Sequence, residues 1–180
     1  MFHRGWNGAP QWVLQQGAWW ACVLGAEPWG YLVMILFVIV HLGFNRSQLG
    51  TEGLLVLAAL GVGFCVDAVL THSNFVHYEG LHRVLDVPLW MLALWAGFGA
   101  TLRHSQRLLV ASPIRGFLIG ALAGPLAYAG GEGLGRLEIF GVGGFFLIGL
   151  NWAIALGILA WCVRRSDASQ TIPLDESREA

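Results

Sequence analysis

The chain contains no lysine and few charged residues of any kind. Charged residues make up 12% of its 180 residues, about half of the roughly 25% that is usual in soluble proteins. Apolar residues make up 56%, and the mean hydropathy is +0.63. This composition excludes a disordered protein and argues against a water-soluble globule, so we expect an integral membrane protein.

The charge balance and the cysteines exclude several classes of function. All ten basic residues are arginines and the formal net charge is -1, so the sequence offers no basic field for nucleic acid. Cys22, Cys65 and Cys162 lie far apart inside apolar runs, a spacing that fits neither a disulfide framework nor a metal centre. The sequence also lacks HExxH, nucleophile-elbow, GxGxxG and P-loop motifs. We therefore expect no cofactor and no metal.

The apolar runs are long, continuous and without strand-like alternation, which predicts membrane-spanning helices. We expect an all-α fold, a polytopic integral membrane protein with a bundle of about six transmembrane helices. The six runs are residues 12–26, 29–44, 53–72, 88–102, 114–131 and 139–163. Glu27-Pro28 separates the first two runs, because proline disfavours helix at the residue before it. A single helix over 12–44 would be roughly 50 Å long, too long for a bilayer without a large tilt.

The first run leaves alternatives open. It provides only about 22 Å of helix, so it either reaches the interface on both sides or crosses half of the bilayer. A secretory signal with Arg4 in its basic region is a further alternative. Gln15 and Gln16 interrupt the apolar stretch and another apolar run follows, which favours a membrane span.

The arginines predict the orientation. Eight of the ten fall at the N-terminus, in the second and fourth loops and near the C-terminus, whereas only Arg83 and Arg136 fall on the other side. Because cytoplasmic loops hold the excess of positive charge, we expect both termini in the cytoplasm. Residues 1–165 are expected to form one transmembrane helical domain, and the polar residues 166–180 a disordered cytoplasmic tail. Gly120 and Gly124 form a small-xxx-small pattern, which predicts close helix packing.

Asp67 is the most costly polar residue within the runs, because a charge at the centre of a membrane helix costs at least about 2.5–3.5 kcal/mol. It either ties helices together through hydrogen bonds or acts as a proton carrier, ion ligand or acid–base group. Tyr128 and Glu132 lie at a similar expected depth and share a face if their helix continues through Gly130 and Gly131. The candidate intramembrane site consists of Asp67, Tyr128, Glu132, His72 and Asn151.

A second set of polar residues lies toward the expected cytoplasmic side. Gln16 belongs to the first run, His41 to the second, and Arg103 and His104 follow the fourth. The two histidines either cap their helices in the headgroup zone or join the other residues in a polar site.

The third loop contains three histidines. His72, His77 and His82 are spaced five residues apart, with Glu79 and Asp86 among them. Imidazoles and carboxylates suit zinc, but zinc ligands on one helix face come four residues apart. This spacing does not predict a metal site.

Several clusters together resemble an uncharacterised bacterial inner-membrane family, known as domain of unknown function 2878. In chain order, they are Gln16-xx-Trp19 with Cys22 to Ala26, Asp67, Pro88-Leu89-Trp90 through Leu94-Trp95, Thr101 with His104-Ser105, and Gly124-Pro125-xx-Tyr128 followed by Leu134-Gly135. The resemblance covers most of residues 12–163. It implies a short polytopic protein of the bacterial inner membrane with no established activity, and members that accompany fatty-acid-modifying enzymes. Loop 73–86 departs from the pattern, so nothing is carried over to its histidines, and the family supplies no catalytic residues.

Three functions follow from these observations. The first is an accessory membrane protein that binds membrane lipid or a partner enzyme of lipid modification. The second is a small proton-coupled transporter with Asp67 as the titrating group. The third is an intramembrane lipid-modifying enzyme that uses Asp67, Tyr128 and His104, although Asp67 and His104 fall on opposite sides of the expected bilayer. We favour a binding protein over an enzyme.

Overall fold

The computed structural model of the chain describes residues 8–25 and 27–170. Six α-helices form in this part of the chain, as predicted, and the all-α fold is confirmed. They are α1 (Ala9–Leu24), α2 (Trp29–Phe44), α3 (Leu49–His72), α4 (Leu89–Thr101), α5 (Pro113–Gly133) and α6 (Gly141–Gln170). Arg4, Ala26, Arg178 and residues 171–180 of the expected tail lie outside the described residues.

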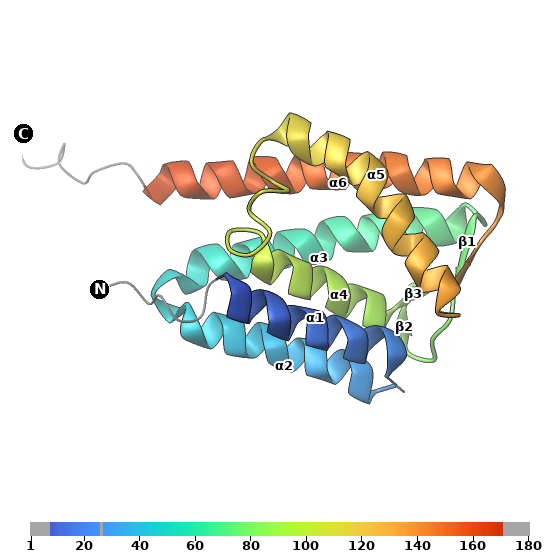
Figure 1. Cartoon of the computed structure of the whole chain (residues 1–180), viewed down its shortest axis with the longest axis horizontal. Coiled ribbons are helices and arrows are strands. Elements are labelled where there is room, and N and C mark those ends of the chain that lie inside the picture. Colours follow the sequence, from blue (N-terminus) through green and yellow to red (C-terminus); the bar gives the residue numbers. More distant parts are fainter. Residues whose placement is uncertain (1–7, 26, 171–180) are drawn as a thin grey trace, which may run out of the picture.

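Most of the helices run back and forth along one axis, and α5 crosses α6 at an angle (Figure 1). Helices α1 to α4 form one group, and the hairpin of α5 and α6 packs on it mainly through α3 and α6. Helix α4 is central, and none of its large apolar side chains is exposed. The ends of α2, α4 and α6 lie together at one end of the molecule, and the short strands lie at the other (Figure 1).

The expected loop between α3 and α4 contains short strands that the sequence did not predict. Strand β1 (Val76–Tyr78) pairs antiparallel with β4 (Leu137–Ile139), and β2 (Arg83–Val84) pairs with β3 (Val87–Pro88). The β1–β4 pair ties this loop to the connection between α5 and α6. Tyr78 is fully buried at the end of β1, so the pairing directs its ring into the helix bundle.

Two helix boundaries differ from the predicted ones by four residues or more. Helix α3 begins at Leu49 instead of residue 53, so Glu52 lies inside the helix and is buried. Helix α6 continues past the expected end at residue 163 to Gln170, so residues 166–170 are helical instead of disordered. Asp167 accepts a hydrogen bond from Arg103, and this contact helps to hold the polar turns against the segment after α4.

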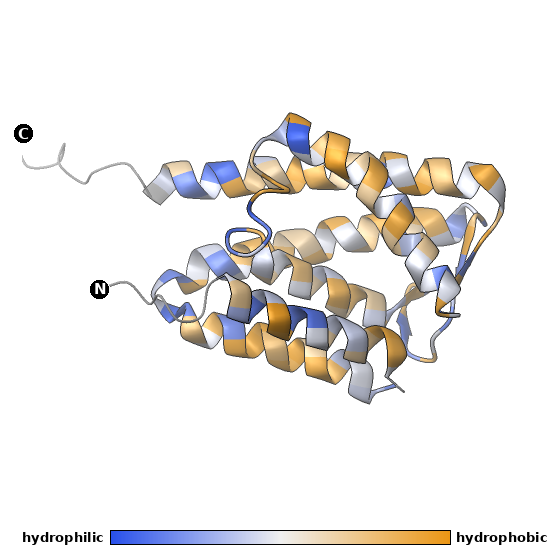
Figure 2. Cartoon of the chain, in the orientation of Figure 1, coloured by the Kyte–Doolittle hydropathy of each residue, from blue (hydrophilic) through white to orange (hydrophobic). Residues whose placement is uncertain are grey.

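Two of the helices are long and apolar enough to cross a membrane, one within Arg46–His72 and one within Gly141–Ser169. Helices α2 and α4 are apolar but shorter, so six complete spans remain a proposal. The hydropathy colouring shows mostly apolar residues along the helices. Polar residues gather where α2, α4 and α6 end, around the short strands at the other end, and on α1 (Figure 2).

The predicted small-xxx-small pattern on α5 packs against α6. A Cβ at Gly120 would lie 2.3 Å from the carbonyl oxygen of Trp152, and one at Gly124 would lie 2.4 Å from the Cγ of the same residue. Both glycines therefore allow α5 and α6 to approach closely.

Candidate functional site

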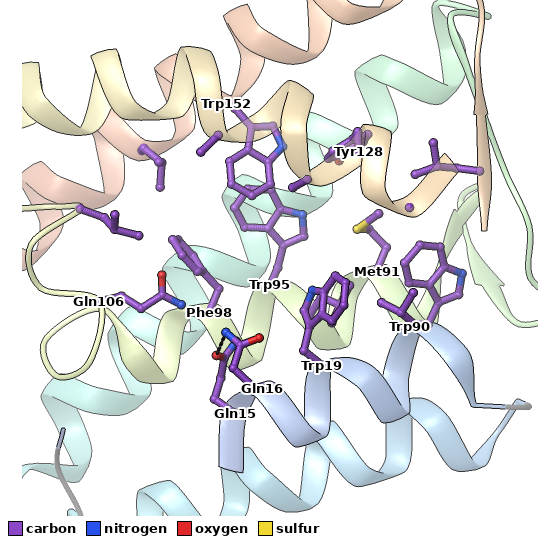
Figure 3. A pocket seen from close by; sticks show the side chains of 18 residues that line it. Gln15, Gln16, Trp19, Trp90, Met91, Trp95, Phe98, Gln106, Tyr128 and Trp152 are labelled. Carbon is purple, nitrogen blue, oxygen red and sulfur yellow. Dashed lines mark hydrogen bonds between the residues drawn. The ribbon is translucent and has the colours of Figure 1, made fainter. Parts of the chain in front are cut away.

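A cleft of about 350 Å³ lies between α1 and α4 on one side and α5 and α6 on the other (Figure 3). Its walls are mainly aromatic and aliphatic, as is usual in pockets that bind small apolar ligands. Its large side chains include Trp19, Met91, Trp95, Phe98, Tyr128 and Trp152. We refer to this space as the cleft.

The two ends of the cleft differ in chemistry. Gln15, Gln16 and Gln106 lie at one end, and Trp90 lies at the other (Figure 3). The Gln16 amide donates a 3.2 Å hydrogen bond to Oε1 of Gln15. Gln16 was grouped with His41 in the predicted cytoplasmic-side set, but it lines the cleft. Gln11, about one turn before Gln15 on α1, makes the contact with His41.

Asp67 lies one layer behind the cleft wall and is fully buried. Its Oδ2 accepts a 2.8 Å hydrogen bond from the indole N–H of Trp95. Its Oδ1 accepts hydrogen bonds from the hydroxyls of Tyr128 and, at 2.7 Å, Tyr78. Trp95 and Tyr128 also line the cleft. Three donors therefore satisfy the carboxylate, and two of them connect it to the cleft.

The structure brings Asp67 and Tyr128 together but not the other members of the predicted intramembrane set. Glu132 accepts a hydrogen bond from the backbone N–H of Ile139, so it ties the end of the α5–α6 connection to the last turn of α5. The exposed ring of His72 contacts the carbonyl of Ala68 in its own helix. The Asn151 amide likewise donates to a carbonyl one turn earlier in α6. The side chains of Glu132, His72 and Asn151 therefore each contact a backbone atom nearby in the sequence and do not join Asp67.

The second polar cluster forms around the buried carboxylate of Glu52. His41 Nε2 lies 3.2 Å from Oε2 of Glu52. His104 Nε2 and the guanidinium of Arg103 each lie 3.1 Å from Oε1. The predicted grouping of His41, Arg103 and His104 therefore exists, with Glu52 at its centre and Gln11 in place of Gln16. The cluster joins α1, α2, α3 and the segment after α4.

His41, Glu52 and His104 could in principle hold a metal ion, since their ligand atoms lie within 4.8 Å of one another. The neighbours of His41 argue against it. The Gln11 side chain donates to the carbonyl of Ala100 and accepts from the backbone N–H of Ser105, which fixes the orientation of its amide.

The fixed Gln11 amide directs its Nε2 at Nδ1 of His41, 3.0 Å away. Nδ1 must therefore accept, and the proton of the neutral ring lies on Nε2, facing Glu52. A metal would need the Nε2 lone pair, so this arrangement favours a hydrogen-bonded cluster that anchors helices.

The sequence reasoning missed Glu52, Gln11, Tyr78 and Trp95. Glu52 directly precedes the predicted run 53–72 and was left outside it because it is charged. Gln11 and Gln15 are four residues apart, a spacing that places both on one helix face and could have indicated a polar stripe. Tyr78 and Trp95 carry no such signal, because their roles depend on where the β1–β4 pair and α4 lie in the fold.

Comparison with known proteins gives one family match. The sequence profile of a family described as protein of unknown function (DUF2878) matches residues 10–158, as the resemblance of the motifs predicted. No curated protein and no solved structure matches the chain.

Proposed function

The chain belongs to the DUF2878 family of proteins of unknown function, and we propose that it is a multi-pass membrane protein that binds a lipid chain in the cleft. The observation that carries this proposal is the cleft itself. Its volume of about 350 Å³ and its largely aromatic walls suit an apolar chain. Three glutamine amides at one end offer hydrogen bonds without adding a charge.

The surroundings of the cleft support entry from a bilayer. Ala127 lines the cleft and is exposed on α5, so the cleft reaches the molecular surface. Nearby residues on the outer face of α5, including Leu122 and Leu126, are more than two-thirds exposed. A lipid chain would therefore pass from one apolar environment to another.

The outer surface supports a position within the membrane. Helices α1, α2, α3, α5 and α6 all expose large apolar side chains, and soluble proteins rarely expose contiguous apolar surfaces of that extent. The polar side chains of Asp67 and Glu52 are buried instead. This distribution suits a protein whose solvent is lipid.

The described arginines favour the predicted orientation in a bacterial inner membrane. Arg83 and Arg136 belong to the segments at the strand end of the molecule. The other described arginines belong to segments at the opposite end, where α2, α4 and α6 terminate (Figure 1): Arg46, Arg103, Arg107, Arg115, Arg164 and Arg165. By the positive-inside rule that end faces the cytoplasm. We further propose that the chain acts as an accessory protein of membrane enzymes that modify lipids, the role that the resemblance to the family implies.

Native mass spectrometry of the detergent-solubilised protein tests the lipid proposal. We expect co-purifying lipid on the wild type and its loss from Ala123→Trp, which fills the cleft. Leu126→Trp adds the same ring to the outer face of the same helix and should keep the lipid. Equal lipid on the two variants, or none on the wild type after adding back lipid extract, would contradict the proposal.

A proton-coupled transporter is the second candidate, because Asp67 is bonded to two residues of the cleft wall. It predicts that Asp67→Asn abolishes substrate-dependent proton uptake in vesicles. A lipid-modifying enzyme that combines Asp67 with His104 has less support, since these residues belong to separate clusters.

A further inference from the structure

A pair of oppositely charged residues, Glu27 and Arg136, lies beside the Trp90 end of the cleft. The guanidinium of Arg136 lies over the ring of Trp90, 5.1 Å from its centroid. The backbone N–H of Arg136 donates to the carbonyl of Gly131. Trp90 and Gly131 both line the cleft, as does Leu137, the residue after Arg136. The pair therefore adjoins the cleft at the strand end of the molecule, where a lipid headgroup would lie.

One oxygen of Glu27 is fully used by the protein. Its Oε2 lies 3.0 Å from the backbone nitrogens of Leu81 and His82 and from Nδ1 of the His82 ring. Burial opposes ionisation of the carboxyl group, but the hydrogen bonds from His82 and Leu81 outweigh it and lower its pKa below the usual value. Glu27 is therefore ionised at neutral pH and acts only as an acceptor.

The facing atoms of the pair have no hydrogen-bond partner. Oε1 of Glu27 and both Nε and Nη2 of Arg136 are buried and unpartnered, and the Glu27 side chain is only 7% exposed. Nη2 lies 3.8 Å from Oε1, too far for a direct hydrogen bond. Leaving buried polar atoms unpaired costs about 1–3 kcal/mol each, so these atoms indicate a missing polar group.

Gly80 packs closely against Oε1 of Glu27. A Cβ at Gly80 would lie 2.8 Å from Oε1 of Glu27 and 3.2 Å from Nε1 of Trp90. Any side chain there would crowd the acceptor.

We propose that Glu27 and Arg136 bind the hydroxyl group of a lipid alcohol whose chain lies in the cleft. This inference rests on the proposed function. A hydroxyl has two lone pairs and one proton, which match the two open donors of Arg136 and the open acceptor of Glu27. Its neutrality suits a site where the charges of Arg136 and Glu27 already balance.

Other head groups match less well. A carboxylate could accept from both nitrogens of Arg136, but its charge would lie beside Glu27 Oε1. An ether accepts but gives Glu27 no proton. A water molecule satisfies the same atoms, and it is the occupant that the experiment must distinguish from a lipid hydroxyl.

Native mass spectrometry with dodecanol, dodecyl methyl ether and dodecanoate tests the proposal on the full chain. We expect dodecanol to bind the wild type about tenfold or more tightly than the ether, because the ether leaves a charged group unpaired. We expect a similar preference over dodecanoate. Glu27→Gln removes the negative charge, so the preference for the alcohol over dodecanoate should disappear or reverse. Glu138→Gln, an exposed carboxylate on β4, should leave all three affinities unchanged.

The outcomes separate the two proposals. If the alcohol and the ether bind equally and Ala123→Trp displaces both, the cleft binds lipid but the hydroxyl site is wrong and the pair holds water. If none of the three ligands binds, the proposed function itself fails. Should Glu27→Gln fail to fold, Arg136→Lys decides, since it keeps the charge and loses the two-pronged donor geometry. We expect that variant to lose the preference for the alcohol over the ether, and an unchanged preference would overturn the site.

Discussion

The indole N–H of Trp95 donates a 2.8 Å hydrogen bond to Oδ2 of Asp67, and the ring of Trp95 forms part of the cleft wall. Tyr128 repeats this arrangement on the facing helix α5, since its hydroxyl donates to Oδ1 of Asp67. One buried carboxylate therefore fixes two side chains on opposite walls of the cleft. The shape of the cleft therefore depends on a carboxyl group that does not line it.

Replacing Asp67 should disturb both stability and binding. In Asp67→Asn one acceptor oxygen becomes an N–H₂ group, so at least one of the three donors loses its partner. The expected loss is about 1–3 kcal/mol of unfolding free energy, with weaker lipid binding in the cleft. Thermal unfolding in detergent measures the first effect and native mass spectrometry the second. Asp86→Asn, an exposed position, serves as the control, and equal stability of the two variants would contradict this role.

Close packing of α5 on α6 predicts a contrast between two glycines of α5. Gly120→Ala should lower the unfolding temperature, because the new Cβ would lie 2.3 Å from a backbone oxygen of α6. Gly130→Ala meets nothing within 4 Å and should stabilise the helix by about 0.5–1 kcal/mol. A shift in the same direction for both variants would refute the packing described here.

Arg103 binds two carboxylates that differ in burial, which predicts unequal effects of removing them. The side chain of Glu52 is 2% exposed and that of Asp167 is 55% exposed. Glu52→Gln should cost about 3–5 kcal/mol, because the largely buried guanidinium of Arg103 loses its anionic partner. Asp167→Asn should cost less than about 1 kcal/mol, as is usual for exposed pairs. Denaturant unfolding of both variants gives the comparison, and similar losses would count against Glu52 as the centre of its cluster.

The lowered pKa of Glu27 predicts an acid-dependent loss of stability. Because its pKa in the folded protein lies below the ordinary value of 4.5, the ionised group stabilises the fold above that pH, and the contribution is lost as the pH falls through the folded value. The unfolding temperature of the wild type should therefore fall more than that of Glu27→Gln when the pH is lowered from neutral to below the folded pKa. Parallel curves for the two proteins would show that Glu27 makes no such contribution.

The helices could be predicted from the sequence because each apolar run is continuous and ends at polar residues, proline or glycine. The same rule failed at Glu52, which the prediction left just outside the run 53–72. Its hydrogen bonds with His41, Arg103 and His104 allow it to be buried inside α3. It failed again after Arg164, because the contact between Arg103 and Asp167 is not visible in sequence.

Parts of the candidate site could also be predicted. Asp67 and Tyr128 were grouped by their expected depth, and His41, Arg103 and His104 by their common side. Glu27 and Arg136 were interpreted only as a helix breaker and a loop charge. More than a hundred positions separate them in the chain, and only the folded connections bring them together, so no spacing rule could pair them.

Photo-crosslinking with a long-chain alcohol that carries a diazirine in its chain tests the central claim most directly. The account predicts saturable adducts on residues that line the cleft, such as Leu94 and Met91, with their loss in Ala123→Trp. Adducts confined to outward-facing residues such as Leu36 and Leu126, rising in proportion to the amount of probe, would contradict it.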